Sequence, residues 1–258
     1  MIKKPVLYVE HFPTDKKRLL FDFCYSAKMG AEFLGINVKV FEDSSEVPED
    51  PTNILVGSVE QCSKWLDMNG YGTPDAIDIS IFGQYLRREV AYMDMDDFTK
   101  CALEMQREGA YEPMFIKPAT KIKAFTGFVV DDPKMISLWS NNFTGRIQIQ
   151  PVIDNIFSEY RCYISNNKIV GMKHYLGDPL LFPNAEFIRE CKKKGDELNL
   201  HSYTLDFGVT EDNETLLIES NDGWAIGNYG LDPETYYLFV RNRWLQMTNI
   251  RTKMDGIL

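Results

Sequence analysis

Two carboxylates and one side-chain amide fall on neighbouring apolar segments late in the chain. The segments and the polar turn between them span 204–221, and their pattern is that of a β-hairpin. If residues 211 and 214 close a tight turn, Asp206 lies opposite Glu219. Asn221 then points to the same face, because side chains alternate along a strand. Mg²⁺ binds oxygen ligands of this kind together with phosphates and water, so the spacing predicts a magnesium site.

A solvated acidic hairpin is the alternative interpretation of the same residues. The chain holds 38 Asp and Glu against 28 Lys and Arg, for a net charge of −10, so acidic surface segments are expected in any part of it. Two carboxylates directly opposite each other also repel, and either water or a bound cation relieves that repulsion. The hairpin alone leaves both interpretations open.

Composition narrows the class of protein. With 258 residues, of which 44% are hydrophobic, the chain can bury a sizeable core in one large domain or two small ones. The acidic net charge argues against general nucleic-acid binding through phosphates. The five cysteines show no CxxC spacing and are interpreted as reduced thiols of a cytoplasmic protein. No apolar run reaches the length of a membrane span, so no membrane association is expected.

The pattern of elements changes along the chain. Residues 1–74 show the pattern of strand, helix, strand, strand and helix, with the first helix over 15–35, which predicts a small α/β domain. From residue 75 on, hairpin-linked strands and interspersed helices predict an α+β domain over 75–258. The strands expected there cover 113–117, 126–130, 146–153, 159–165 and 168–176, and the helices cover 94–109, 131–141, 184–199 and 232–247.

Cationic residues accompany the expected strands and loops of this second part. Lys117 ends its apolar strand, and Lys121 and Lys123 lie on a basic loop suited to covering phosphates. A lysine at a strand end is also an ordinary solvated tip. The alternating strand 146–153 meets a proline at position 151, which disrupts ladder pairing and frees backbone groups for the edge of a base.

A second hairpin carries Arg161 and Lys173, and its turn decides whether they meet. A two-residue turn at Asn166 and Asn167 sets Lys173 opposite Tyr160, away from the face of Arg161. A three-residue loop with Asn167 left-handed sets Lys173 opposite Arg161 instead. Asparagine allows both turns, and a functional pair of cations requires the second.

The order of these motifs resembles the ATP-grasp fold. Over about residues 75–245 the chain shows, in order, a lysine strand, a covering loop, a hinge strand, Glu-Tyr-Arg-Cys-Tyr-Ile, Gly-Met-Lys, Leu-Asp-Phe and Ile-Glu-Ser-Asn. These motifs are similar to those of the ribosomal-protein and peptide glutamate ligases. The size and short N-terminal layer are similar to the small viral and bacterial ATP-grasp clade named for one arginine and two lysines. The resemblance implies two α+β subdomains that clasp ATP, preceded by a small Rossmann-like α/β domain.

The resemblance also implies a role for each candidate residue. ATP phosphates need cations and Mg²⁺ to neutralise the charge that develops during phosphoryl transfer. By this comparison Lys117 and Lys123 bind the phosphates, Gln150, Pro151, Val152 and Ile153 form the adenine hinge, Asp154 faces the ribose, Arg161 and Lys173 meet the transferred phosphate, and Asp206, Glu219 and Asn221 bind Mg²⁺.

The activity implied is carboxylate–amine ligation with ATP and Mg²⁺ through an acyl-phosphate. Its partners would be ATP and a small-molecule or peptide carboxylate and amine, and a homodimer is compatible with it. The alternatives are a kinase that phosphorylates a hydroxyl, a non-catalytic ATP-binding assembly factor, and an interaction protein whose charges are solvated. Residues 119–125 lack the glycines usual in the covering loop, and 222–230 replaces the usual turn facing the acceptor. The resemblance therefore does not imply the identity of the acceptor.

Overall fold

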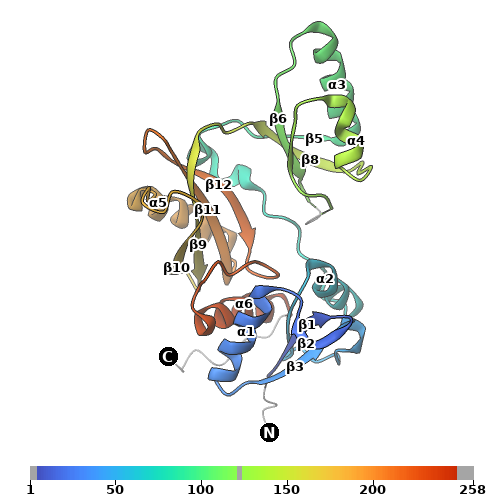
Figure 1. The fold of residues 1–258 in the computed structure, drawn as a ribbon, viewed down its shortest axis with the longest axis vertical. Helices are drawn as coiled ribbons and strands as arrows, with labels where there is room; N and C mark the ends of the chain where they lie inside the picture. Colours follow the sequence, from blue (N-terminus) through green and yellow to red (C-terminus); the bar gives the residue numbers. More distant parts are fainter. Residues whose placement is uncertain (1–4, 121–123, 249–258) are drawn as a thin grey trace.

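The computed structural model describes residues 5–120 and 124–248, which form three four-stranded sheets. Figure 1 shows an N-terminal sheet at one end of the long axis, a central sheet, and a third sheet at the opposite end. The central and third sheets both form after residue 75. The arrangement agrees with an α/β layer followed by two α+β subdomains.

The strand β1 is the centre of the N-terminal sheet, where it pairs in parallel with β3 and β4 and antiparallel with β2. The helix expected over 15–35 is shorter than predicted, because residues 15–19 form a strand that pairs with β1, and α1 begins at Asp22. Tertiary pairing here outweighs local helix propensity. The elements are β1 (Val6–Phe12), β2 (Asp15–Leu19), α1 (Asp22–Phe33), β3 (Asn37–Phe41), η1 (Ser44–Glu46), β4 (Ile54–Val56) and α2 (Val59–Met68).

The last helix, α6 (Pro233–Met247), packs against this N-terminal layer. Gly30 in α1 allows the close approach, since a Cβ there would lie 2.0 Å from the carbonyl oxygen of Pro233. Trp244 of α6 also donates its indole N–H to the carbonyl of Asn53 at 2.9 Å. Residues of the first 74 positions and of α6 thus share one hydrophobic core, and the division of the chain at residue 74 stays a proposal.

The central sheet, in the order β10-β9-β11-β12, is antiparallel and has two unlike faces. Leu205 and Phe207 lie on the apolar face, in a core shared with α5 and η2. Alternation places Arg161, Asp206 and Glu219 on the other face. The elements of this layer are η2 (Ile79–Leu86), β9 (Ile156–Ser165), β10 (Lys168–Gly177), α5 (Ala185–Gly195), η4 (Asp196–Leu198), β11 (Ser202–Thr210) and β12 (Thr215–Asp222).

The third sheet, in the order β5-β8-β6-β7, has a hydrophobic core of its own and stands apart in Figure 1. Helix α3 ends at Glu108 and is followed by Gly109, whose φ of 72° suits a left-handed cap. The helix expected over 131–141 is only a short α4 after a 3₁₀ turn. The elements are β5 (Ala91–Asp94), α3 (Met95–Glu108), β6 (Met114–Pro118), β7 (Phe128–Val130), η3 (Pro133–Met135), α4 (Ile136–Trp139) and β8 (Arg146–Pro151).

Candidate nucleotide and metal site

The hairpin of β11 and β12 places Asp206 directly opposite Glu219, as predicted. Its loop differs from the expected one, because it is closed by Thr210, one residue earlier, and spans three residues with Asn213 left-handed (φ 60°). That loop alone would put the pairing out of register by one residue. A bulge at Ile218 in β12 restores the register.

The hairpin of β9 and β10 reaches its register in a related way. Asn166 and Asn167 form a two-residue turn with φ values of 47° and 60°, which is the turn that would by itself separate Lys173 from Arg161. A bulge at Val170 then shifts the register, so that Lys173 pairs with Arg161. The pairing that function requires is present, but a bulge rather than a longer loop produces it.

Asp206 is buried and paired with Arg161 on the neighbouring strand β9. The guanidinium donates from Nε to Oδ1 at 2.8 Å and from Nη2 to Oδ2 at 2.7 Å, and the two side chains are only 8% and 3% exposed. Burial raises the pKa of the Asp206 carboxyl, and the hydrogen bonds from Arg161 oppose that rise. The interpretation of the hairpin as a solvated acidic surface is therefore wrong for Asp206.

Glu219 is paired with Lys117, which comes from β6 in the third sheet. The Lys117 Nζ donates to Glu219 Oε1 at 2.8 Å, and the lysine side chain is 19% exposed, so it is not a solvated strand tip. Burial is the largest effect and acts to raise the pKa of Glu219, but the Lys117 ammonium, the Asn221 amide and the charge of Arg161 together hold that pKa below its usual value. The ion pair joins the central and third sheets at the candidate site.

The donors present fit Mg²⁺. Among the described residues no three His, Cys, Asp or Glu side chains gather into a metal centre. The candidate ligands are thus two carboxylates and one amide, a set that Mg²⁺ supplements with phosphates and water. Asn221 lies two residues beyond Glu219, and its side-chain amide helps to hold the pKa of Glu219 down. Its buried Nδ2 makes no hydrogen bond of ordinary geometry within residues 5–120 and 124–248. Rotation of that carboxamide puts its oxygen in the same place, as a ligand for a cation.

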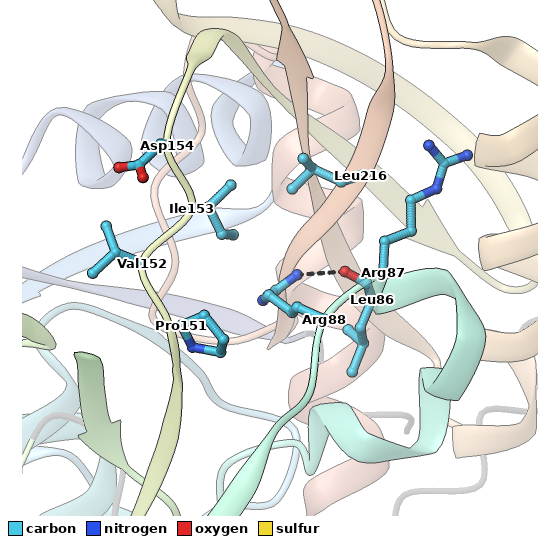
Figure 2. Close-up of a pocket in the computed structure, with 8 residues that line it drawn as sticks. All are labelled: Leu86, Arg87, Arg88, Pro151, Val152, Ile153, Asp154 and Leu216. Carbon is cyan, nitrogen blue, oxygen red and sulfur yellow. Dashed lines mark hydrogen bonds between the residues drawn. The ribbon is translucent and has the colours of Figure 1, made fainter. Parts of the chain in front are cut away.

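A cavity of about 400 Å³ lies beside the expected adenine hinge. Figure 2 shows that three segments line it: 86–88 before β5, 151–154 at and beyond the end of β8, and Leu216 on β12. Pro151, Val152, Ile153 and Asp154 therefore surround one space, as the hinge prediction requires. Gln150 is not among the residues that line this cavity, and its Oε1 accepts a hydrogen bond from Arg88 Nε at 2.8 Å. Adenine binding itself stays a prediction.

The comparison with protein families covers all of these elements. Residues 85–239, more than half of the chain, match the model of an ATP-grasp domain, family 2 of the clade named for one arginine and two lysines. The chain belongs to this family. The match includes the hinge segment and both ion pairs, and it supports an ATP-dependent ligase in general terms. A search of curated proteins finds no match to this ATP-grasp protein.

Solved structures resemble the ATP-grasp protein along almost its whole length. D-cycloserine synthetase DcsG has a TM-score of 0.60 and 8% identity, over 94% of this chain and 99% of that chain. D-alanyl-alanine synthetase A from Vibrio cholerae O1 biovar eltor str. N16961 has 0.57 and 11%, over 95% and 100%. The RimK domain protein ATP-grasp from Sphaerobacter thermophilus DSM 20745 has 0.52 and 12%, over 91% and 99%. At these identities the likeness shows the fold alone.

The loop after Asn221 covers one side of Arg161 with an aromatic ring. The guanidinium carbon of Arg161 lies 4.7 Å from the ring centroid of Tyr229, and that ring stacks on Tyr175 with centroids 4.7 Å apart. Tyr229 adopts a φ of 42° and is 44% exposed, and a positive φ is uncommon for a bulky residue. The segment expected to face the acceptor thus contacts the candidate phosphoryl-binding cation.

The remaining candidates are placed less completely. Lys173 lies opposite Arg161 on β10, and Lys123 is outside the described residues. His174 follows Lys173 and therefore points to the opposite face, where its ring packs edge-on against Tyr160 at 5.0 Å. Within residues 5–120 and 124–248, no helix is both long and apolar enough to cross a bilayer.

Sequence reasoning missed two of the residues that organise the site. Arg88 makes four hydrogen bonds beside the hinge cavity, although a Leu-Arg-Arg stretch before a strand gives no signal beyond an ordinary charged segment. In the sequence, Tyr229 is only one member of the expected acceptor loop, and its contact with Arg161 depends on how that loop folds back over the sheet.

Proposed function

We propose that this ATP-grasp protein joins a carboxylate to an amine, with Mg–ATP as the driving nucleotide and an acyl-phosphate as the intermediate. The observation that carries the proposal is the placement of Arg161 and Lys117. These cations come from two different sheets and pair with Asp206 and Glu219 on one face of the central sheet. Phosphoryl transfer requires cations and carboxylates that converge in this way.

The reaction is proposed to take two steps. A carboxylate oxygen of the donor attacks the γ-phosphorus of ATP, and the bond to the bridging oxygen breaks to release ADP. The amine nitrogen then attacks the acyl carbon, phosphate leaves, and the nitrogen loses a proton to solvent as the amide forms. The protein would supply position and charge rather than a nucleophile.

Most of the candidate residues have a place in this scheme. Lys117 would bind the phosphates of ATP, and 151–154 would enclose the base and ribose. Asp206, Glu219 and Asn221 would hold Mg²⁺, which neutralises phosphate charge when bound. Arg161 would contact the transferred phosphoryl group, since a planar guanidinium can bind two of its oxygens at once.

The names of the structural neighbours support a ligase over a kinase only by analogy of fold. Two of them are described as synthetases, of D-cycloserine and of D-alanyl-alanine. One fold hosts many reactions, so the substrates of this chain have to be found by experiment.

The first experiment is a screen of metabolite and peptide pools for ATP-dependent release of ADP, with mass spectrometry of the product. We expect a product whose mass equals donor plus acceptor minus water. Glu219→Gln should lose this activity. Glu211→Gln, an exposed carboxylate in the turn of the same hairpin, is the matched control and should keep it.

Hydroxylamine separates the proposed ligase from its alternatives. It attacks an acyl-phosphate to give a hydroxamate, so a ligase given its carboxylate and ATP should form one without the amine. A phosphorylated hydroxyl would identify a kinase. Nucleotide binding without ADP release across the pools would favour the assembly-factor alternative, and both results contradict the proposal.

A further inference from the structure

Arg88 lies at the junction of the hinge and the metal-site strand. It follows η2, lines the cavity with 151–154, and reaches toward β12 (Figure 2). Its Nη1 donates to the carbonyl of Leu217 at 2.7 Å, and its Nη2 donates to the carbonyl of Ile218 at 2.9 Å. These two carbonyls flank the bulge that sets Glu219 opposite Asp206.

The same guanidinium holds the other side of the junction. Its Nε donates to Oε1 of Gln150, on the strand that leads into the hinge, at 2.8 Å, and Nη1 also donates to the carbonyl of Leu86 at 2.9 Å. Burial lowers the pKa of Arg88 to about 10, so the group stays charged at neutral pH. One planar group thus contacts η2, β8 and β12.

The acceptors explain why an arginine is suited to this place. A bulge interrupts the regular strand ladder, and β12 is an edge strand of the sheet, so carbonyls there depend on other donors. A buried carbonyl without a donor costs about 1–3 kcal/mol. Arginine presents five N–H donors in a fixed plane, whereas lysine presents a point charge with three.

We infer that Arg88 is a positioning residue that fixes the Ile218 bulge and thereby couples the adenine hinge to the metal carboxylates. The inference rests on the proposed use of Asp206 and Glu219 as Mg²⁺ ligands. Without this clamp β12 can relax toward the register set by its loop, and Glu219 then leaves its position opposite Asp206. A residue that only stabilises the fold would not affect magnesium dependence in particular.

The test is the affinity for ATP, measured by calorimetry over a range of Mg²⁺ concentrations. Partners that orient metal ligands typically change metal affinity about 10- to 100-fold when replaced. We therefore expect Arg88→Lys to raise the half-saturating Mg²⁺ concentration about 10- to 100-fold. The readout is the ratio of ATP affinities with and without Mg²⁺, because Arg88 also lines the cavity proposed for the base and affects both affinities. Arg189→Lys, an exposed arginine on α5, is the matched control and should behave as the parent.

Hydrogen exchange in the nucleotide-free protein gives a second measurement that needs no activity. Arg88→Lys should speed exchange of the amides in 216–222 and leave those of α5 unchanged. If Arg88→Lys fails to fold, Gln150→Leu replaces it, because that change removes only the hinge end of the clamp. Gln150→Leu should likewise speed exchange of the amides in 216–222.

The outcomes separate this inference from the proposed ligase activity. An unchanged Mg²⁺ dependence together with unchanged exchange at 216–222 would overturn the role of Arg88. If Arg88→Lys changes the Mg²⁺ dependence of ATP binding as expected but no pool gives a ligated product, the inference about Arg88 holds and the ligase proposal fails. Hydrogen exchange decides the inference even if the unmodified protein binds no ATP. Exchange at 216–222 that is equally fast in Arg88→Lys and in the unmodified protein overturns the role of Arg88, and faster exchange there in Arg88→Lys supports it.

Discussion

Two buried arginine–aspartate pairs in this protein have nearly the same geometry and different surroundings. Arg161 binds Asp206 through two hydrogen bonds of 2.8 and 2.7 Å, and Arg243 binds Asp222 through two of 2.6 and 2.7 Å. The four side chains are between 3% and 8% exposed. Pair geometry and burial therefore do not distinguish them.

Their neighbours do distinguish them. Arg243 sits on α6 and also donates to Gln246 at 3.0 Å, so its pair links that helix to the end of β12. The pair of Arg161 lies across from Lys173, beside Glu219, and under the partly exposed ring of Tyr229. A buried pair with further charges beside it can exchange partners when a charged ligand arrives, whereas a pair without such neighbours only stabilises the fold. The surroundings of a pair, rather than its geometry, therefore indicate its function.

The largest effect on stability is expected at the pair of Arg243 and Asp222. Arg243→Ala leaves Asp222 buried and unpaired, which costs about 3–5 kcal/mol of stability. Urea unfolding measures this loss. The exposed control Arg189→Ala should stay within about 0.5 kcal/mol of the parent. If Arg243→Ala lowered the free energy of unfolding by less than about 0.5 kcal/mol, the range expected for the control, the structural role of that pair would be refuted.

Arg161→Lys should reduce turnover about a hundredfold or more, the range seen when a donor to developing charge is removed. Lysine cannot hold two phosphoryl oxygens in a plane, and an interaction made mainly in the transition state affects turnover more than ATP affinity. Steady-state kinetics with a working donor and acceptor check this. Arg243→Lys is the matched variant and should lose stability with turnover retained. Equal turnover in both would remove the contrast between the pairs.

Lys117→Ala should raise the dissociation constant for ATP about 10- to 100-fold, since a charged hydrogen bond contributes about 1.5–3 kcal/mol. Lys117 contacts the Glu219 side of the site and has no counterpart near Arg243 among the hydrogen bonds of residues 5–120 and 124–248. Calorimetry makes the measurement, with the exposed Lys134→Ala as control. Unchanged affinity would remove Lys117 from the phosphate site.

Asp206→Asn and Asp222→Asn compare the acidic halves of the two pairs. Both should lose about 1–3 kcal/mol of stability, because a buried guanidinium keeps an acceptor but loses its countercharge. Only Asp206→Asn should also abolish the rise in melting temperature that Mg–ATP produces. Thermal melts with and without Mg–ATP decide this. A ligand-induced shift in Asp206→Asn equal to that in Asp222→Asn would contradict the metal assignment.

Tyr229→Leu should have the smallest effect. An exposed cation–π contact contributes about 0.5–1 kcal/mol, so the melting temperature should fall by about 1–4 °C. Leucine keeps apolar cover over Arg161 and loses only the ring. No change relative to the exposed control Phe33→Leu would show that the contact with Arg161 contributes nothing to stability.

Local sequence was sufficient to predict the kinds of residue, their order and the faces they share. The pairing of Asp206 with Glu219 was predicted correctly, although from a loop one residue away from the one that forms. Local signals also placed helix starts, because Asn184 accepts hydrogen bonds from the next backbone N–H groups, and Asp232 caps α6 ahead of its proline. The order of motifs was enough to indicate the ATP-grasp fold. Strand faces and helix caps depend on neighbours within a few residues, so the local sequence is sufficient to predict them.

Assembly of the sheets, by contrast, settles how the strands register and which charges pair. Both hairpin loops differ from the ones that the functional arrangement suggested, and bulges at Val170 and Ile218 compensate. The segment 15–19 became a strand because β1 offered a partner. The Ile218 bulge is held by Arg88, a residue 130 positions away in the chain. A contact over that separation exists only once the sheets have assembled, so no local sequence pattern predicts it.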